Sequence, residues 1–400
     1  MSGERALFVI DNDFGALGTV MYLLHGQALH GRATVLLPQR AHDLHHGHLP
    51  VESRPYRSAE DILGVVDEVK PHVVCLFSGY VLALQGVLSV EALRDLVGEL
   101  RRRGCKVATS DPFLGTFPRI MEADLPTSPG TFRRMVGGLL APLPGMGPQV
   151  ETFFSDHARK RLQSHVRQVV EILDETTHVY PVPVDGLGAK GRGMRISFAN
   201  LAYLRPAEQL RAGASRLPSW LFILAKFDLE FQERTHGKKG FRELVARRIR
   251  EALDNGRSAT FIGPAEVTEA LSIEFGANPD VSLLPYCAYQ EFERRLLEAE
   301  YAFYWQIFSS STFLRLWNGL PVFFFDPGHN AHLLVPMQQA GLEYYYLADP
   351  PIYLGADHYL EAATLASMSQ GFRASADESR RRLAELPTPA GMIEAIAERG

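Results

Sequence analysis

The sequence predicts an α/β protein built from two doubly wound parallel-sheet domains and a helical carboxyl-terminal tail. Short β-rich runs alternate with helical patterns in both halves of the chain, which is typical of parallel sheets covered by helices on both faces. The length of 400 residues suits about two domains of ordinary size. An apolar fraction of 46% and a charged fraction of 22% match a globular protein with a sizeable core.

The first half contains β-rich runs that each lead into a helical pattern. The run ALFVI, for example, is followed at once by GALGTVMYLLHG. A later segment, residues 126–148, is rich in Gly and Pro and predicts a loop region around a short helix. The expected strands are residues 6–10, 33–38, 72–77 and 105–110.

The alternation resumes near residue 220 and predicts a second doubly wound unit. After residue 355 the sequence has helical periodicity and no strand pattern. We therefore expect domains at residues 1–195 and 196–345, and a tail at residues 346–400 that packs back across both. The expected strands of the second unit are residues 220–227, 259–263, 281–286, 301–305 and 321–326.

Charge and cysteine use narrow the classes of function. A net charge of -5 at pH 7 gives no general attraction to nucleic acid or to an anionic membrane, so neither is an expected partner. The three cysteines have no CxxC spacing and lie in or beside apolar segments, which indicates buried thiols in a reducing compartment. No apolar run approaches the ~20 residues of a membrane span, and the amino end lacks a secretory pattern. We expect a cytoplasmic protein.

Four hydroxylated residues separate an apolar run from a short helical pattern. A helix that starts here has unpaired N–H groups and the positive end of its dipole at these residues, and their hydroxyls add donors without charge. The pattern predicts an anion site. Plain N-capping is the alternative, because Ser and Thr are preferred at helix starts. The four residues are Ser309, Ser310, Ser311 and Thr312.

The chain from about residue 215 to 335 resembles nucleotide-sugar glycosyltransferases of the GT-B fold. In that fold a helix amino end holds the donor diphosphate, and a Gly-x-Pro turn precedes the next strand, as at Gly319 and Pro321. The resemblance extends loosely over both halves and implies two Rossmann-like domains that face a cleft. Within this fold the chain is similar to the bacterial protein-arginine rhamnosyltransferase family. The matching residues are Leu284, Pro285, Tyr286, Ser311, Trp317, Gly319, Pro321, Ala331, His332 and Leu333.

The sequence also departs from these families. Ser309 and Ser310 replace a Glu-Asp pair of the rhamnosyltransferases. Tyr289, with Gln290 beside it, stands where that family has a Gln that contacts the base. Leu314 stands where many GT-B transferases have an acid that holds the ribose. The resemblance therefore does not name the donor.

The resemblance implies roles for residues that follow the strands of the second half. Tyr286, Tyr289 and Gln290 would surround the nucleotide base. A loop that faces the sugar would contain Asp326, His329 and His332, whose carboxylate and imidazoles suit sugar hydroxyls. His329 and His332 also have the spacing of a metal pair, but further ligands are not evident, so no metal and no cofactor beyond the nucleotide-sugar co-substrate is expected.

Lys226 follows the first strand of the second half. The resemblance implies a cation at this position, together with the run from Ser309 to Thr312, at the donor diphosphate. A fixed positive charge stabilises a leaving diphosphate more in the transition state than in the ground state. The alternative is a solvated lysine at a strand end.

The turn IDNDFGALG follows the first strand of the chain and places Asp11, Asp13 and Gly15 at its carboxyl end. Doubly wound folds gather ligand and catalytic groups at such ends. Glycine lets a ligand approach the backbone, and a carboxylate can deprotonate an acceptor. We expect Asp13 to be the general base, with Asp11 behind it. The alternative is Asp13 as the N-cap of the next helix.

Two further strand ends of the first half supply candidates on the acceptor side of the cleft. Ser78 and Gly79 follow one strand, and Asp111 follows the next. Because parallel strands end at one edge, these residues are expected to face the same cleft. Asp111 precedes Pro112 and alternatively starts a turn.

The sequence therefore predicts a glycosyltransferase that moves a sugar from a nucleotide-diphosphate donor to an acceptor held mainly by the first domain. An Asp13 base predicts inversion at the anomeric carbon, without a metal. The acceptor class stays open between a small molecule, a glycan and a peptide or protein. A nucleotide-sugar epimerase or hydrolase of the same fold, and a noncatalytic sugar-nucleotide-binding protein, are the alternatives.

Overall fold

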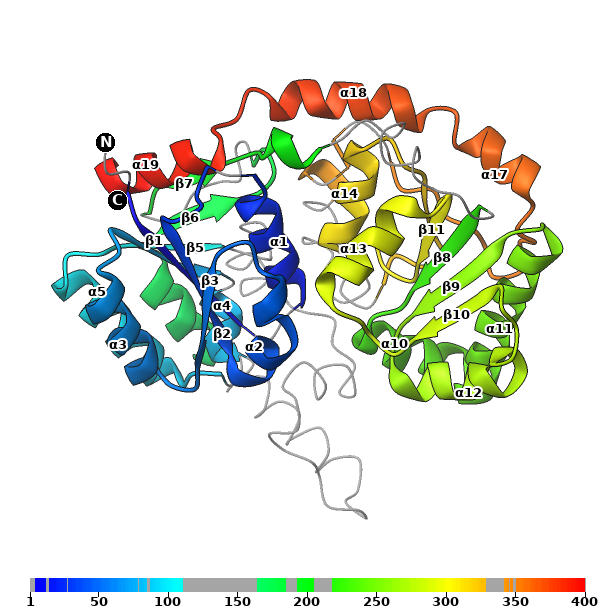
Figure 1. The fold of residues 1–400 in the computed structure, drawn as a ribbon, viewed down its shortest axis with the longest axis horizontal. Coiled ribbons are helices and arrows are strands. Elements are labelled where there is room, and N and C mark those ends of the chain that lie inside the picture. Colours follow the sequence, from blue (N-terminus) through cyan, green and yellow to red (C-terminus); the bar gives the residue numbers. More distant parts are fainter. Residues whose placement is uncertain are drawn as a thin grey trace, which may run out of the picture. The chain divides into compact units, whose positions relative to one another are not determined.

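The computed structural model (Figure 1) divides into two compact units, residues 1–200 with 385–400 and residues 201–384. The chain passes from the first unit to the second between Asn200 and Leu201, and it returns after Ala384. The structure describes residues 4–11, 14–26, 28–77, 79–84, 87–110, 164–184, 193–204, 218–328, 342–344, 346–347 and 350–399.

The first unit is built on a sheet of seven described strands in the order β3-β2-β1-β4-β5-β6-β7. All neighbouring strands are parallel. The central strands β1 and β4 are buried along their whole length. The strands are β1 (Ala6–Ile10), β2 (Ala33–Pro38), β3 (Glu52–Tyr56), β4 (Val73–Phe77), β5 (Lys106–Ser110), β6 (Thr177–Tyr180) and β7 (Arg195–Ser197).

Helices cover this sheet. Ile62 and Val66 of α3 and Leu93 of α5 join an apolar cluster on one face of the strands. Both helices begin at a serine, Ser58 or Ser89, whose hydroxyl accepts from the backbone N–H three residues later, at 3.3 and 3.0 Å. The helices are α1 (Phe14–Leu24), α2 (Gln39–His45), α3 (Ala59–Val69), α4 (Gly79–Leu84), α5 (Val90–Arg102), a helix at residues 164–173, and α19 (Pro389–Arg399).

The second unit contains a five-stranded parallel sheet in the order β10-β9-β8-β11-β12. Its core is aromatic: the rings of Phe222 and Phe303 stack with centroids 5.0 Å apart, and Phe303 also stacks on Phe323 and Phe325. The strands are β8 (Ser219–Ile223), β9 (Ser258–Ile262), β10 (Val281–Leu284), β11 (Tyr301–Tyr304) and β12 (Val322–Phe324).

The helices of the second unit lie on both faces of its sheet. Phe241 and Ile249 of α11 and Leu271 of α12 pack with the aromatic core on one face. Figure 1 shows α13 and α14 on the other side of the strands. The helices are α10 (Lys226–His236), α11 (Lys238–Asp254), α12 (Ala265–Phe275), α13 (Tyr289–Glu298), α14 (Ser310–Trp317), α17 (Ala362–Met368) and α18 (Phe372–Leu383).

These two parallel sheets confirm the predicted doubly wound α/β architecture. The sequence patterns predicted neither β3 nor β7. Strand β3 is an edge strand with the polar sequence ESRPY, and four of its five residues keep solvent contact. Such a strand lacks the apolar run that identified the central strands, and Pro55 is tolerated because an edge strand pairs on one side only.

The segment between the units is anchored at both ends. Asn200, the last residue of the first unit, donates through Nδ2 to the carbonyls of Tyr22 and His25 at the end of α1, both at 2.8 Å. Tyr203, in the second unit, donates its hydroxyl to Glu293 of α13. These hydrogen bonds satisfy buried polar groups. Asn200 is therefore held to the first unit, and Tyr203 is held to the second.

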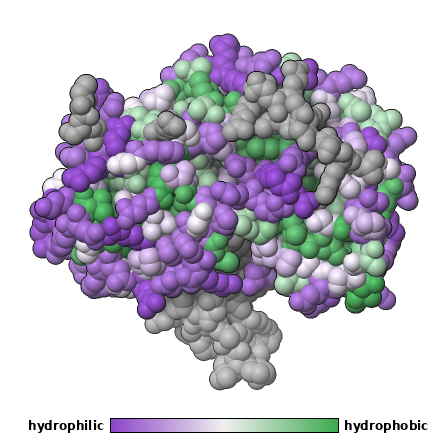
Figure 2. Space-filling view, in the orientation of Figure 1, coloured by the Kyte–Doolittle hydropathy of each residue, from purple (hydrophilic) through white to green (hydrophobic). Residues whose placement is uncertain are grey.

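The surface drawn in Figure 2 is mainly hydrophilic, with hydrophobic residues in small separate groups. Large apolar side chains that are exposed occur singly, such as Ile273 at 90% and Leu44 at 57%. Among the described helices, none has the length and apolar character needed to cross a bilayer.

Replacement of Gly79 by alanine is expected to destabilise the first unit. The N–H of Gly79 donates to Thr109 Oγ1 at 3.2 Å, and an added Cβ would lie only 2.5 Å from that oxygen. The clash would displace a hydroxyl that also donates to the carbonyl of Leu76, so Gly79→Ala should lower the free energy of unfolding by about 1–3 kcal/mol in chemical denaturation.

The matched control is Gly64→Ala in α3, where an added Cβ would meet no atom within 4 Å. There alanine should raise stability by about 1 kcal/mol, because it improves helix propensity. Equal effects of the two substitutions would show that close packing on Thr109 is not what requires glycine at position 79.

Candidate functional site

The carboxyl ends of the five strands in the second sheet lie at one edge, because the strands are parallel. The strand order reverses at the central strand β8, which pairs with β9 on one side and with β11 on the other. Doubly wound sheets bind ligands at such a reversal. Helices α10, α12, α13 and α14 start at this edge after β8, β9, β10 and β11. The two that follow the central strands β8 and β11 are α10, whose first residue is Lys226, and α14, whose N-cap is Ser309.

At the start of α14 the hydroxyls divide into two pairs. Those of Ser311 and Thr312 are buried and used inside the unit: Tyr304 Oη donates to Ser311 Oγ at 2.9 Å, and Thr312 Oγ1 donates to the carbonyl of Ser309 at 2.7 Å. Ser309 and Ser310 are half-buried. Ser309 caps the helix, because its hydroxyl accepts from the N–H of Ser311. Ser310 therefore presents the hydroxyl least engaged by the described residues.

A buried arginine fixes α14 in position. The guanidinium of Arg315 donates to the carbonyls of Leu296 and Ala299 at the end of α13 and of Pro321 at the start of β12. Its rigid fork of donors suits several carbonyls at once. Gly319 then ends the helix at a φ of +68°, a left-handed conformation that favours glycine. Arg315 thus ties the predicted Gly-x-Pro turn, which follows the carboxyl end of α14, to the end of α13.

Lys226 is exposed at the first position of α10, and the N-cap residue before it supplies no side-chain hydrogen bond. The hydroxyl of Tyr286 accepts from the backbone N–H of Lys226. Burial, with the negative charges of Glu266 and Asp228, raises the pKa of Tyr286 to about 12, so its phenol stays protonated at neutral pH. Tyr286 follows β10 at a φ of +51° and remains 44% exposed. Its ring therefore reaches from the edge strand to the centre of the sheet edge.

Two buried polar residues of α10 were missed in the sequence. Asp228 is 3% exposed, and its Oδ1 lies 3.2 Å from where a Cβ on Gly328 would stand. Gln232, one turn later, is 2% exposed, and its Nε2 has no hydrogen-bond acceptor among the described residues. The sequence could have indicated Asp228, because it is an acid in the first turn of a helix that follows a strand. No sequence pattern indicates that Gln232 is buried.

Asp326 follows β12 at the same edge. Its Oδ1 accepts from the N–H of Gly328 at 2.7 Å, which closes a local turn and orients the carboxylate. Burial, together with the charge of Asp326, raises the pKa of Tyr353, which is 45% exposed. His329 and His332, the other predicted sugar-side residues, lie outside the described residues.

The two remaining candidates for the base differ in exposure. Tyr289 is 8% exposed, and its hydroxyl lies 3.3 Å from that of Tyr203, so little of its surface is open to a ligand. Gln290, the next residue of α13, is exposed. Of the three predicted base contacts, Tyr286 and Gln290 have accessible surface.

In the first unit, Asp11 directly follows β1 and is 1% exposed. Tyr56 donates its hydroxyl to the carbonyl of Ile10 at 2.7 Å, and burial with the charge of Asp11 raises the pKa of Tyr56. Asp11 therefore lies behind the surface. Gly15 lies in the first turn of α1, and Asp13, Ser78 and Asp111 lie outside the described residues.

A buried histidine-tyrosine pair in the first unit was not expected. His178 of β6 is 8% exposed; its Nδ1 lies 3.0 Å from the carbonyl of Thr176, and its Nε2 lies 2.7 Å from the hydroxyl of Tyr80. Because a carbonyl only accepts, Nδ1 carries the proton and Nε2 accepts from Tyr80. Burial lowers the pKa of His178 to about 4. The two residues are 98 positions apart, so only the fold reveals the pair.

Within the described part of the chain, no group of three His, Cys, Asp or Glu side chains is arranged to hold a metal ion.

No protein-family model and no curated protein matches the sequence. Solved structures match the fold over nearly the whole chain. Os79 from O. sativa in complex with UDP aligns with a TM-score of 0.53 and 11% identity over 99% of this chain and 100% of that one. CalG4, the calicheamicin glycosyltransferase, aligns with a TM-score of 0.48 and 15% identity over 100% of this chain and 99% of that one. A putative UDP-N-acetylglucosamine 2-epimerase from Listeria monocytogenes aligns with a TM-score of 0.48 and 11% identity over 100% of this chain and 95% of that one.

The alignment with Os79 shows that the chain has the GT-B fold of glycosyltransferases, as the sequence predicted. An identity this low shows the fold alone. The activity is therefore argued from the residues at the sheet edge.

The His178 environment predicts an acid-sensitive first unit. The pKa is about 4 in the fold and 6.5 in the unfolded chain, so between these values the unfolded state binds one proton more. The stability that depends on a neutral His178 is fully present above pH 6.5. The free energy of unfolding falls by roughly 3 kcal/mol as the pH drops to 4. In denaturation measured across this range, His178→Gln should reduce the pH dependence by that amount.

Tyr80→Phe is the matched control, because it removes the phenol and leaves the histidine buried. If burial is the main cause, this variant keeps the pH dependence of the wild type. A His178→Gln variant with an unchanged slope would contradict the assignment.

Proposed function

We propose that this protein is a glycosyltransferase that binds a nucleoside diphosphate-sugar at the carboxyl edge of its second sheet and transfers the sugar to an acceptor. The observation that carries the proposal is the start of two helices, α10 and α14, on adjacent central strands where the strand order reverses. Both helix ends direct N–H groups and the positive end of a dipole toward that edge, which favours a diphosphate. Lys226 adds a full positive charge.

The other groups at this edge suit the rest of such a donor. The protonated phenol of Tyr286 offers a ring face and a polar tip to a base. Asp326, held by the N–H of Gly328, offers carboxylate oxygens to sugar hydroxyls. Leu314 is buried in α14 and supplies no acid for the ribose, so the donor ribose would be held by other groups.

The proposed reaction needs no metal. The acceptor oxygen forms a bond to the anomeric carbon as the bond from that carbon to the diphosphate oxygen breaks, and the electron pair leaves with the nucleoside diphosphate. Lys226 and the two helix ends would stabilise the charge that develops there. Asp13 would take the acceptor proton, which predicts inversion.

The first test is a thermal-shift panel of UDP-, GDP-, dTDP-, CMP- and ADP-sugars with their free nucleotides. At a hundredfold excess over Kd, a ligand stabilises the fold by about 3 kcal/mol, which raises Tm by several degrees. One nucleotide series should do so in the wild type, and Ser310→Asp should abolish the shift because its carboxylate repels a diphosphate.

Ser89→Asp is the matched control, because it makes the same change at the amino end of α5 in the other unit. It should keep the wild-type shift. No shift with any nucleotide would remove the basis of the proposal and leave Ser309 as a helix cap.

Lys226→Gln should lower kcat about 10²- to 10³-fold with a smaller change in KM, because a positive charge acts mainly on the leaving group. The measurement is release of nucleoside diphosphate from the donor identified above, with acceptors screened among small molecules, glycans and peptides. Lys70→Gln, at an exposed lysine of the first unit, should leave the rate unchanged. Product formed from the donor alone would favour an epimerase or a hydrolase.

A further inference from the structure

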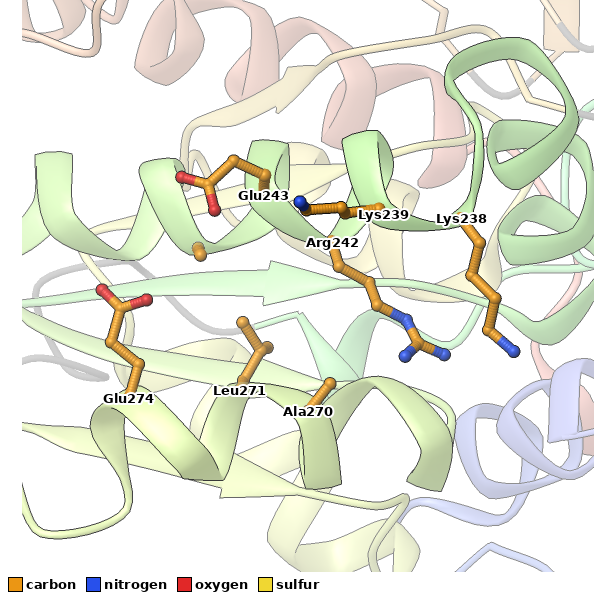
Figure 3. Close-up of a pocket in the computed structure, with 8 residues that line it drawn as sticks. Lys238, Lys239, Arg242, Glu243, Ala270, Leu271 and Glu274 are labelled. Atoms are coloured by element: carbon orange, nitrogen blue, oxygen red, sulfur yellow. The ribbon is translucent and has the colours of Figure 1, made fainter.

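A cavity of about 440 Å³ lies between α11 and α12. Its floor is apolar: Ala246 and Leu271 are 5% and 3% exposed, and Ala270 lies beside them. Figure 3 shows Ala270 and Leu271 extending from α12 toward α11. The lining comes from the facing sides of two helices, and none of the lining residues belongs to the proposed donor site.

Three cations line the cavity at the start of α11. They are Lys238, Lys239 and Arg242, and the first turn of this helix contains no acid. The structure describes no acidic partner within 4 Å of either lysine, and Arg242 has only Glu233, at 3.8 Å. Lys238 and Arg242 are four residues apart, so their like charges repel on one helix face. The positive end of the helix dipole adds to this repulsion.

The two acids in the cavity do not neutralise these cations. Glu243 and Glu274 both bind Arg250, at 2.8 and 2.7 Å, on the side away from the start of the helix. Lys238 and Arg242 therefore keep their positive charges at one end of the cavity, while Glu243 and Glu274 at the other end are already paired.

The guanidinium of Arg242 has an unmet hydrogen bond. Its Nε is buried and has no acceptor among the described residues. Figure 3 shows this guanidinium extending from α11 into the space between the helices, with Lys238 beside it. A buried donor without an acceptor is unfavourable, and an anionic oxygen in the cavity would satisfy it.

We propose that this cavity binds a small phosphate-bearing metabolite with at least two negative charges. The phosphate would lie against Lys238, Lys239 and Arg242, where it relieves the repulsion between them and accepts from Arg242. The remainder of the ligand would cover Ala246 and Leu271. The volume is that of a small-molecule site. This site does not depend on the glycosyltransferase proposal.

The test is isothermal titration calorimetry of the full chain with inorganic pyrophosphate in phosphate-free, low-salt buffer. One equivalent should bind in this cavity, apart from any weaker equivalent at the proposed donor site, and its binding should weaken as salt is raised. Arg242→Gln and Lys239→Glu should each weaken binding at least tenfold. Lys239→Glu should not lower Tm, because glutamate suits a first helical turn. The matched control Lys70→Glu, at an exposed lysine of the first unit, should bind as the wild type does.

Ser310→Asp separates this site from the proposed donor site and should leave pyrophosphate binding in the cavity intact. Binding that is lost in Ser310→Asp but kept in Lys239→Glu would place the anion at the sheet edge, which overturns this inference and supports the donor site. Equal weakening by Lys70→Glu and Lys239→Glu, or no binding by the wild type, would also overturn it, whatever the nucleotide panel shows.

Discussion

The parallel direction of the strands in the second unit is the constraint on which its candidate site depends. Because all five strands end at one edge, side chains that are far apart in sequence are brought to one place: Lys226 after β8, Tyr286 after β10 and Asp326 after β12. Reversal of the strand order between β8 and β11 puts the starts of α10 and α14 on adjacent strands. The aromatic stack around Phe303 holds these strands together beneath that edge.

Buried arginines then fix the elements that carry the polar groups. Arg315 ties α14 to α13 and β12 through backbone carbonyls. Arg248 pairs with Glu251, donates to the carbonyls of Gly355 and Ala356, and lies 4.7 Å from the ring centre of Phe325. Removing a charge from water is costly unless its donors are satisfied, and in these two residues the acceptors are mostly main-chain oxygens. Arg315 acts at the amino ends of β11 and β12, so it holds α14 from the edge of the sheet opposite to the candidate site.

The two anion sites inferred in this unit differ in how charge is supplied. At the sheet edge, the donors are uncharged hydroxyls and N–H groups at two helix starts, and Lys226 is the one cation of the proposed donor site. Between α11 and α12, three cations line one cavity. The described ion pairs give them one acidic partner, Glu233, which lies 3.8 Å from Arg242. The first arrangement suits a ligand that must leave as product, since neutral donors bind an anion less tightly than clustered charges do. The second suits retention of a small anion.

The sequence alone determined the fold class, because strand-helix alternation with apolar runs such as ALFVI and PVFFFD admits few other arrangements. It also located the start of α14 and the turn at Gly319, because capping and left-handed glycine are local chemistry. Contacts between distant residues were decided only by the tertiary structure. They include the His178–Tyr80 pair and the hydrogen bonds from Arg315 to the carbonyls of Leu296 and Ala299. Local sequence sets backbone preference, whereas burial and hydrogen-bond partners depend on which elements the fold brings together.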